Sequence, residues 1–192
     1  MILAGLPILL TISSCTQEVG GQVSPADRTS ITGSDATGDE DYRLAPPVDN
    51  PRNIAELGPC ELLSPTTAGA AGFLPDGILE EEPDGSQRCA WQPEDHPDGR
   101  VALWTDVDRR GLHEMYVLQE NYPDFREFEV AGYPAVQASL GGATEMYCYI
   151  HVGVAEDQFV TFSSSLGMKQ DDDPCAQAVR VAEVAVPAFP AA

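Results

Sequence analysis

Cysteines and histidines are the side chains of this chain whose types could support chemistry, and their spacing limits what that chemistry can be. The 192 residues include five cysteines and three histidines. No two cysteines stand two to four residues apart and no histidine lies at ligand spacing beside them, so a zinc site is not indicated. There is also no Cys-x-x-Cys redox motif. These patterns favour structural disulfides among the four cysteines in the body of the chain, Cys60, Cys89, Cys148 and Cys175. No cofactor or metal is expected.

His113 and His151 are the histidines that an enzyme could use together with nearby carboxylates. Neither belongs to a recognisable catalytic motif, because the chain has no Gly-x-Ser-x-Gly elbow and no His-Glu-x-x-His zinc motif. An envelope hydrolase that uses His151 or His113 stays open as the alternative function. The sequence favours a role without catalysis.

The first 14 residues form an apolar run, which is shorter than the about 20 residues that a helix needs to span a bilayer. We interpret the run as a secretory signal. Ile12-Ser13-Ser14-Cys15 resembles the bacterial lipoprotein box, in which small residues admit the signal peptidase and the cysteine thiol carries a diacylglyceryl group. The resemblance implies lipidation, palmitate included, at Cys15 and a stable anchor on the outer face of the cytoplasmic membrane.

The run departs from the usual signal because no lysine or arginine precedes it. Either the true start of translation lies upstream or the signal is weak. The alternative interpretation is a buried apolar segment with an incidental free cysteine.

Composition divides the rest of the chain into a tether, a domain and a short tail. Residues 15–52 are rich in Gly, Ser, Thr, Pro and Asp and have few bulky apolar groups, so they predict a disordered tether behind the lipidated cysteine. The folded domain is expected over residues 53–188, followed by a tail over 189–192.

The chain is strongly acidic, with 31 Asp and Glu against 10 Lys and Arg and a formal net charge of −21. This balance excludes nucleic acid as a partner, because no basic surface is available to displace counterions from phosphates. It also argues against docking on anionic lipid headgroups. High solubility explains the acidity at least as well as a cationic partner does.

The clearest element of the domain is a hairpin within Glu145–Ser163. Alternation with a period of two places Cys148 and its apolar neighbours on one face, and Tyr147, Tyr149 and His151 on the other. The segment Ala155-Glu156-Asp157 is the expected turn.

Around this hairpin the pattern predicts an α+β domain, in which an antiparallel β-meander of about five to six strands packs with two to three helices and carries two disulfides. Helices are expected over Thr66–Ala71, from Asp108 to about Asn121, and from Asp173 to Val186. An acidic loop is expected over Pro75–Gln87. Further strands are expected at Arg88–Gln92, Arg100–Thr105, Phe125–Val130 and Ala135–Leu140.

Four cysteines allow three disulfide connectivities. We favour Cys60–Cys89, which ties the opening segment to the Cys-Ala-Trp strand, and Cys148–Cys175, which ties the last helix to the hairpin. Each would close a loop approaching 30 residues and stabilise the domain by about 3–4 kcal/mol in the entropic account.

An ordered set of motifs resembles a family of actinobacterial exported lipoproteins that share a single domain of unknown function. The set comprises the Pro-Cys-x-Leu-Leu opening at Pro59, the Cys-x-Trp strand at Cys89, the segment Val130–Ala135, the late-strand Cys148 and the Asp-Pro-Cys helix start at Asp173. The resemblance implies export, lipidation and paired disulfides. It implies no activity.

Tyr147, Tyr149 and His151 form a candidate binding face opposite the core face of the hairpin. Aromatic side chains with polar ends suit recognition of an envelope protein, a peptide or a glycan. The alternative is that another helix or the first segment covers this face and makes it a second core layer. The sequence therefore predicts a membrane-anchored cell-surface lipoprotein, a binding or accessory module of the cell envelope.

Overall fold

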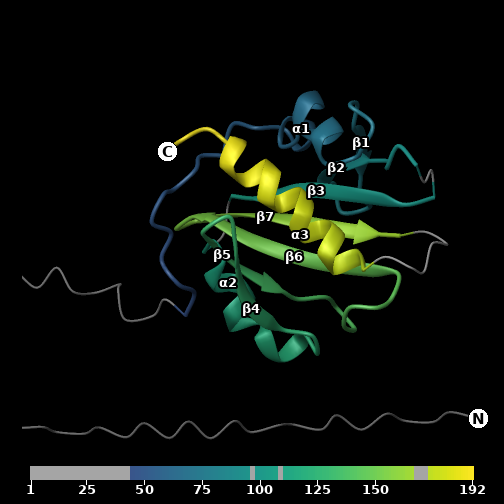
Figure 1. Cartoon of the computed structure of the whole chain (residues 1–192). Coiled ribbons are helices and arrows are strands. Elements are labelled where there is room, and N and C mark those ends of the chain that lie inside the picture. The colour runs from purple at the N-terminus through teal and green to yellow at the C-terminus, as the bar shows by residue number, and fades with distance from the viewer. Residues whose placement is uncertain (1–43, 96–97, 108–109, 167–172) are drawn as a thin grey trace, which may run out of the picture. The chain divides into compact units, whose positions relative to one another are not determined.

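The structure is a computed structural model that describes residues 44–95, 98–107, 110–166 and 173–192. Seven strands form one sheet (Figure 1): β1 (Ile78–Glu81), β2 (Gln87–Trp91), β3 (Arg100–Asp106), β4 (Arg126–Val130), β5 (Tyr133–Gln137), β6 (Tyr147–Ala155) and β7 (Gln158–Ser165). The helices are α1 (Pro65–Ala70), α2 (His113–Val117) and α3 (Pro174–Ala185), with 3-10 turns η2 (Pro59–Glu61), η3 (Gln119–Asn121) and η4 (Val186–Ala188).

The sheet is antiparallel throughout and has the strand order β1-β2-β3-β7-β6-β5-β4. The α+β class is confirmed. The expected single meander of five to six strands is wrong in detail, because two meanders, β1 to β3 and β4 to β7, join through the pairing of β3 with β7. This long-range pairing places the last strands of the two meanders side by side at the centre of the sheet.

Strand β1 lies in the segment that was expected to be an acidic loop. Its Glu80 carboxylate binds Arg88 at 2.7 Å and Arg100 at 2.9 Å. These ion pairs compensate a charge that otherwise disfavours a strand. Asp84 closes the β1–β2 hairpin by accepting a hydrogen bond from the Ser86 N–H, and Gly85 supplies the positive φ of the turn.

The β6–β7 hairpin agrees with its prediction. Ile150 pairs with Phe162 and His151 with Thr161, and the strands turn at Glu156 and Asp157 between Ala155 and Gln158. Alternate residues of β6 therefore point to opposite faces of the sheet. The apolar set is fully buried, at 0 % exposure for Cys148, Ile150, Val152 and Val154.

Helix α3 covers this apolar face, lying across β6 and β7 in Figure 1. Asp173 caps the helix by accepting a hydrogen bond from the Cys175 N–H at 2.8 Å, and Pro174 occupies its first turn. Both predicted disulfides are present: Cys60–Cys89 joins η2 to β2, and Cys148–Cys175 joins β6 to α3. The main core lies between this face, α3 and the α1 segment.

A smaller core lies on the opposite face of the sheet, which we call the second face. There Leu112, Met115 and Tyr116 pack on Val136, Ala138 and Phe159. The helix expected from 108 to 121 is shorter than predicted: α2 begins at His113, η3 follows it, and residues 108 and 109 lie outside the described part. Among the described residues, helical cover therefore lies over one end of the second face.

Residues on both sides of the expected domain boundaries pair with each other. Arg52 forms an antiparallel bridge with Ala191, and the Asn53 N–H donates to the Pro190 carbonyl. The Arg52 side chain also donates to the Tyr133 hydroxyl at 2.7 Å and to the Phe189 carbonyl at 3.0 Å. These bonds hold the beginning and the end of the domain together, while the boundaries at 53 and 188 stay predictions.

Candidate functional site: an aromatic row on the second face

Three aromatic rings form a continuous row on the part of the second face that α2 leaves open. Trp104 of β3 meets Tyr149 of β6 with ring centroids 6.0 Å apart, and Tyr149 meets Tyr147 at 6.1 Å. The planes cross at 72° and 74°, so both pairs are edge to face. All three side chains are partly exposed. We call Trp104, Tyr149 and Tyr147 the aromatic row.

Small side chains on β7 explain how rings from β3 and β6 reach each other. Strand β7 lies between them, and its Ser163 pairs with Ala102 on one side and Tyr149 on the other. Ser163 and Ser165, on the same face, present only hydroxymethyl groups and are partly exposed. The two large rings therefore meet above β7, and edge-to-face contacts of this kind fix ring orientation.

An ion-pair network borders the row on the β1–β3 side. Arg88 binds Glu80 and Glu82, each at 2.7 Å, and Arg100 reaches Glu80 at 2.9 Å. Arg100 and Glu80 are separated by β2, where the neighbouring Ala90 presents only a methyl group. Two arginines and two glutamates leave this border with no net charge.

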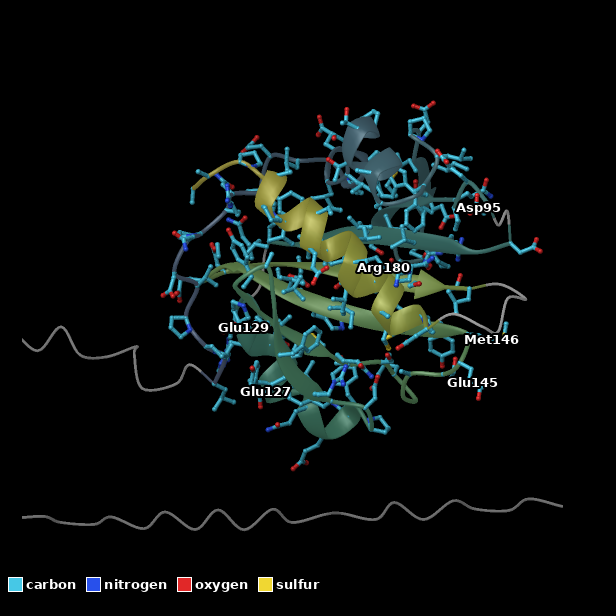
Figure 2. The ribbon with its side chains drawn as sticks, in the orientation of Figure 1. Asp95, Glu127, Glu129, Glu145, Met146 and Arg180 are labelled. Atoms are coloured by element: carbon cyan, nitrogen blue, oxygen red, sulfur yellow. A yellow bond between two sulfur atoms is a disulfide. The ribbon has the colours of Figure 1, made fainter. Side chains whose placement is uncertain are left out.

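The other border is the connection from β5 to β6. Met146 is 49 % exposed, and Figure 2 shows it beside Glu145 at the end of the sheet. Thr144 accepts hydrogen bonds from the Met146 and Tyr147 N–H groups, both at 3.2 Å, which fixes the entry into β6. Met, Tyr, Trp and Arg are the residue types enriched in the cores of protein interfaces.

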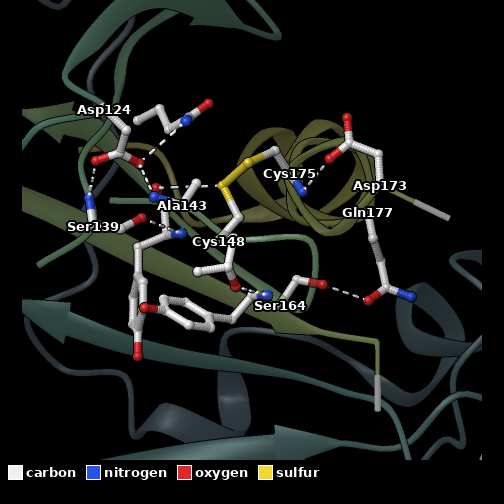
Figure 3. Close-up of a disulfide and its surroundings, with 12 residues drawn as sticks. Asp124, Ser139, Ala143, Cys148, Ser164, Asp173, Cys175 and Gln177 are labelled. Carbon is white, nitrogen blue, oxygen red and sulfur yellow. Dashed lines mark hydrogen bonds between the residues drawn. A yellow bond between two sulfur atoms is a disulfide. The ribbon is translucent and has the colours of Figure 1, made fainter. Parts of the chain in front are cut away.

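Asp124 holds this connection in place (Figure 3). Its carboxylate accepts hydrogen bonds from the backbone N–H groups of Ser139 at 2.8 Å and Ala143 at 3.0 Å, and from the Gln137 amide at 3.1 Å. Burial alone would raise the pKa of Asp124, but the hydrogen bonds outweigh it and lower the pKa. Together with the Cys148–Cys175 bond beside it in Figure 3, this carboxylate fixes the end of the sheet that carries Tyr147.

His151 lies on the same face as the aromatic row but belongs to the buried part. It is 8 % exposed, its Nε2 is 3.0 Å from the Ala138 carbonyl, and its Nδ1 is 2.9 Å from the Thr161 hydroxyl. A carbonyl can only accept, so Nε2 carries the hydrogen and the hydroxyl donates to Nδ1. Burial lowers the pKa of His151 to about 4, against smaller opposing effects of Ala138 and Asp124.

The hydrogen-bond partners of His151 and His113 bear on the hydrolase alternative. Thr161, the hydroxyl that contacts His151, is 1 % exposed, so a substrate has no access to it. The other histidine, His113, uses its Nδ1 to accept a hydrogen bond from the Leu44 N–H at 2.9 Å and so attaches the start of the described chain to α2. Both histidines hold structural hydrogen bonds.

The structure brings together two of the predicted face residues with one that the prediction missed. Tyr147 and Tyr149 are partly exposed, as a binding face requires. His151 is buried instead, and its ring contacts Phe159, which belongs to the cluster that packs against α2. Trp104 completes the row. Its alternation against Val101 and Leu103 in the sequence was the available signal, but only the β3–β7 pairing shows that it adjoins Tyr149. Cys15 lies outside the described residues.

The described part of the chain holds neither a metal-ligand cluster nor a helix suited to crossing a membrane. Residues 44–95, 98–107, 110–166 and 173–192 contain no group of three or more His, Cys, Asp or Glu side chains placed to hold a metal ion. Over the same residues no helix combines the length and the apolar character that crossing a membrane requires.

Comparison with known proteins identifies the family. Residues 10–188 match the family described as "Protein of unknown function (DUF3558)". The chain belongs to this family. Searches of curated proteins and of solved structures found no match. Membership of DUF3558 therefore defines one domain over almost the whole chain and assigns no activity to it.

Proposed function

We propose that this DUF3558 protein is a cell-surface lipoprotein, anchored to the outer face of the cytoplasmic membrane through Cys15, whose domain binds a partner in the cell envelope. The lipoprotein box and the resemblance to actinobacterial exported lipoproteins support the anchor. Two disulfides support an oxidising compartment outside the cytoplasm. The anchor keeps the domain at the membrane surface, where an envelope partner is accessible.

The aromatic row is the observation that carries the binding role. Large aromatic side chains without a binding role are normally buried, because burial of each removes much apolar area from water. Here Trp104, Tyr147 and Tyr149 stay partly exposed, while the opposite face of β6 is completely covered. Their ring–ring contacts orient them without a partner, so little conformational entropy is lost on binding.

The alternative of a second core layer applies to only part of this face. In the described residues, the cluster formed with α2 takes in Val136, Ala138 and Phe159 but none of the aromatic row. The cover thus ends beside His151. The open part has the composition of an interface, and the covered part has that of a core.

Site-specific photo-crosslinking in the native membrane tests the proposal. A crosslinking amino acid replaces Ser165, which is partly exposed beside Tyr147, and in a matched variant it replaces Glu183, which is exposed on α3. We expect a discrete adduct from position 165 and none from 183. A Cys15→Ala chain should lose the adduct, because it is released from the membrane where the partner lies.

The outcome distinguishes the two explanations of the row. Adducts of equal yield from both positions, or none from position 165, would overturn the binding role of this face. An adduct from position 165 that persists undiminished in the Cys15→Ala chain would instead overturn the role of the anchor.

A further inference from the structure

The aromatic row has a geometry that suits one class of ligand group. Because successive ring planes cross at 72° and 74°, the three rings enclose corners instead of forming a flat platform. A ring face left open at such a corner attracts a cation, and this interaction extends to about 6 Å from the ring centroid. A flat sugar ring would gain more from coplanar rings.

The electrostatics around the row favour a cation as well. The chain carries a formal charge of −21, which attracts cations toward the surface over a long range. The nearby Arg88 and Arg100 are neutralised by Glu80 and Glu82, so they add no net repulsion. Glu145, at the other border, is exposed and negatively charged.

Resting on the proposed function, we propose that the aromatic row binds a cationic side chain, a lysine ammonium or an arginine guanidinium, carried by an extended segment of a partner protein. The segment would lie over the end of β7, where Ser165 leaves room beside Tyr147.

Binding of a short lysine–proline repeat peptide to the purified full chain tests this inference. Proline keeps the probe extended without internal structure. The readout is the indole N–H resonance of Trp104, and Trp91, which is 0 % exposed in the core, serves as the internal control. We expect the peptide to shift the Trp104 resonance and to leave that of Trp91 in place.

Two comparisons separate the aromatic site from general attraction to an acidic protein. The same peptide with acetylated lysines should bind at least about tenfold more weakly, because acetylation removes the charge. Trp104→Leu and Tyr149→Leu keep the net charge and most of the apolar area but remove a ring, so each should weaken binding by about tenfold. Tyr149→Phe keeps the ring and should bind as the unchanged chain does.

Equal binding of the acetylated peptide would overturn the inference, and so would unchanged binding by Trp104→Leu. The acetylation test needs no variant and stands even if a substitution impairs folding. A shift of Trp104 by a neutral envelope glycan in place of the peptide would equally overturn it. If the peptide fails while the crosslink from position 165 forms, the cation site is wrong and the binding role stands; if both fail, both are wrong.

Discussion

Single polar side chains fix the conformation of the second face at the residue scale. His151 joins β6 to Thr161 of β7 and to the Ala138 carbonyl, and Asp124 collects three hydrogen bonds at the β5–β6 connection. Both groups are placed so that one protonation state is favoured: the imidazole is neutral and the carboxyl is ionised. Acid should therefore act on the end of the sheet that supports the aromatic row.

The pH dependence of stability should report the burial of His151. Its pKa is about 4 in the folded protein and 6.5 ordinarily, so the unfolded chain takes up the proton first as the pH falls. The contribution to stability is complete above pH 6.5 and is lost toward pH 4, amounting to about 3 kcal/mol.

Urea unfolding of the native chain and of His151→Gln across that range measures this contribution. The free energy of unfolding of the native chain should fall more steeply with acid than that of the variant. Parallel curves for the two proteins would show that His151 is not held neutral by burial.

Asp124→Asn should loosen the β5–β6 connection. The substitution replaces a charged acceptor of three hydrogen bonds by a neutral amide, which should lower the free energy of unfolding by roughly 2 kcal/mol. Since the pKa of Asp124 is lowered, its contribution is present at neutral pH and disappears as the pH falls through its folded value.

Amide hydrogen exchange locates the effect of this variant. The Ser139 and Ala143 N–H groups should exchange faster, while amides of the β1–β2 hairpin should not change. Unaltered exchange at both positions would contradict the role of Asp124.

At the scale of elements, close approaches between segments decide where the second face is covered. Gly111, just before α2, has φ of +58°, and a Cβ there would clash with the Glu156 carbonyl oxygen in the β6–β7 turn. The start of the α2 segment thus rests directly on the tip of the hairpin. Gly132 has φ of +82° in the β4–β5 turn, but a Cβ there would meet nothing within 4 Å.

Gly111→Ala and Gly132→Ala form a matched pair that tests this contact. Both substitutions place alanine at a positive φ, which costs about 1–2 kcal/mol by itself. Gly111→Ala must also displace backbone, so it should destabilise the domain by at least about 1 kcal/mol more than Gly132→Ala. Thermal unfolding of both variants measures the difference, and equal midpoints would show that α2 does not rest on the turn.

Local signals in the sequence predicted the elements that depend on neighbours in the chain. The alternation in β6 and the Asp-Pro start of α3 sufficed for the hairpin and the last helix. The cysteine positions allowed three connectivities, and the favoured one is present. Strand β1 was missed because its stability comes from Arg88 and Arg100, which lie 8 and 20 residues away from Glu80. The short α2 was overestimated because its apolar stripe is set by the hairpin it packs on.

The candidate site was half predictable for the same reason. Two tyrosines at a spacing of two on β6 must share a face, so Tyr147 and Tyr149 could be placed together. Trp104 could not be added, because its contact with Tyr149 depends on the register between β3 and β7. That register pairs Trp104 with Thr161, which lies 57 residues later in the chain. The burial of His151 depends on where the cover by the α2 cluster ends, which no period in the sequence encodes.

At the scale of the whole molecule, the two faces of the sheet have different roles. One face carries α3, both disulfides and the main core, which together make it rigid. The other is covered at one end by α2 and displays the aromatic row at the other. A rigid layer behind a partly open face is the arrangement that positions a binding surface well.

The most direct test of the binding role is the free energy of unfolding of a Tyr147→Ser, Tyr149→Ser double variant, measured in urea. If the row is a binding surface, loss of these partly exposed rings should cost no more than about 2 kcal/mol, and the variant should remain folded. If the row is a hidden second core, the cost should reach the about 3–5 kcal/mol typical of truncating a buried aromatic residue for each ring, or the domain should not fold. The first result is the one we predict, and the second would contradict the proposed function.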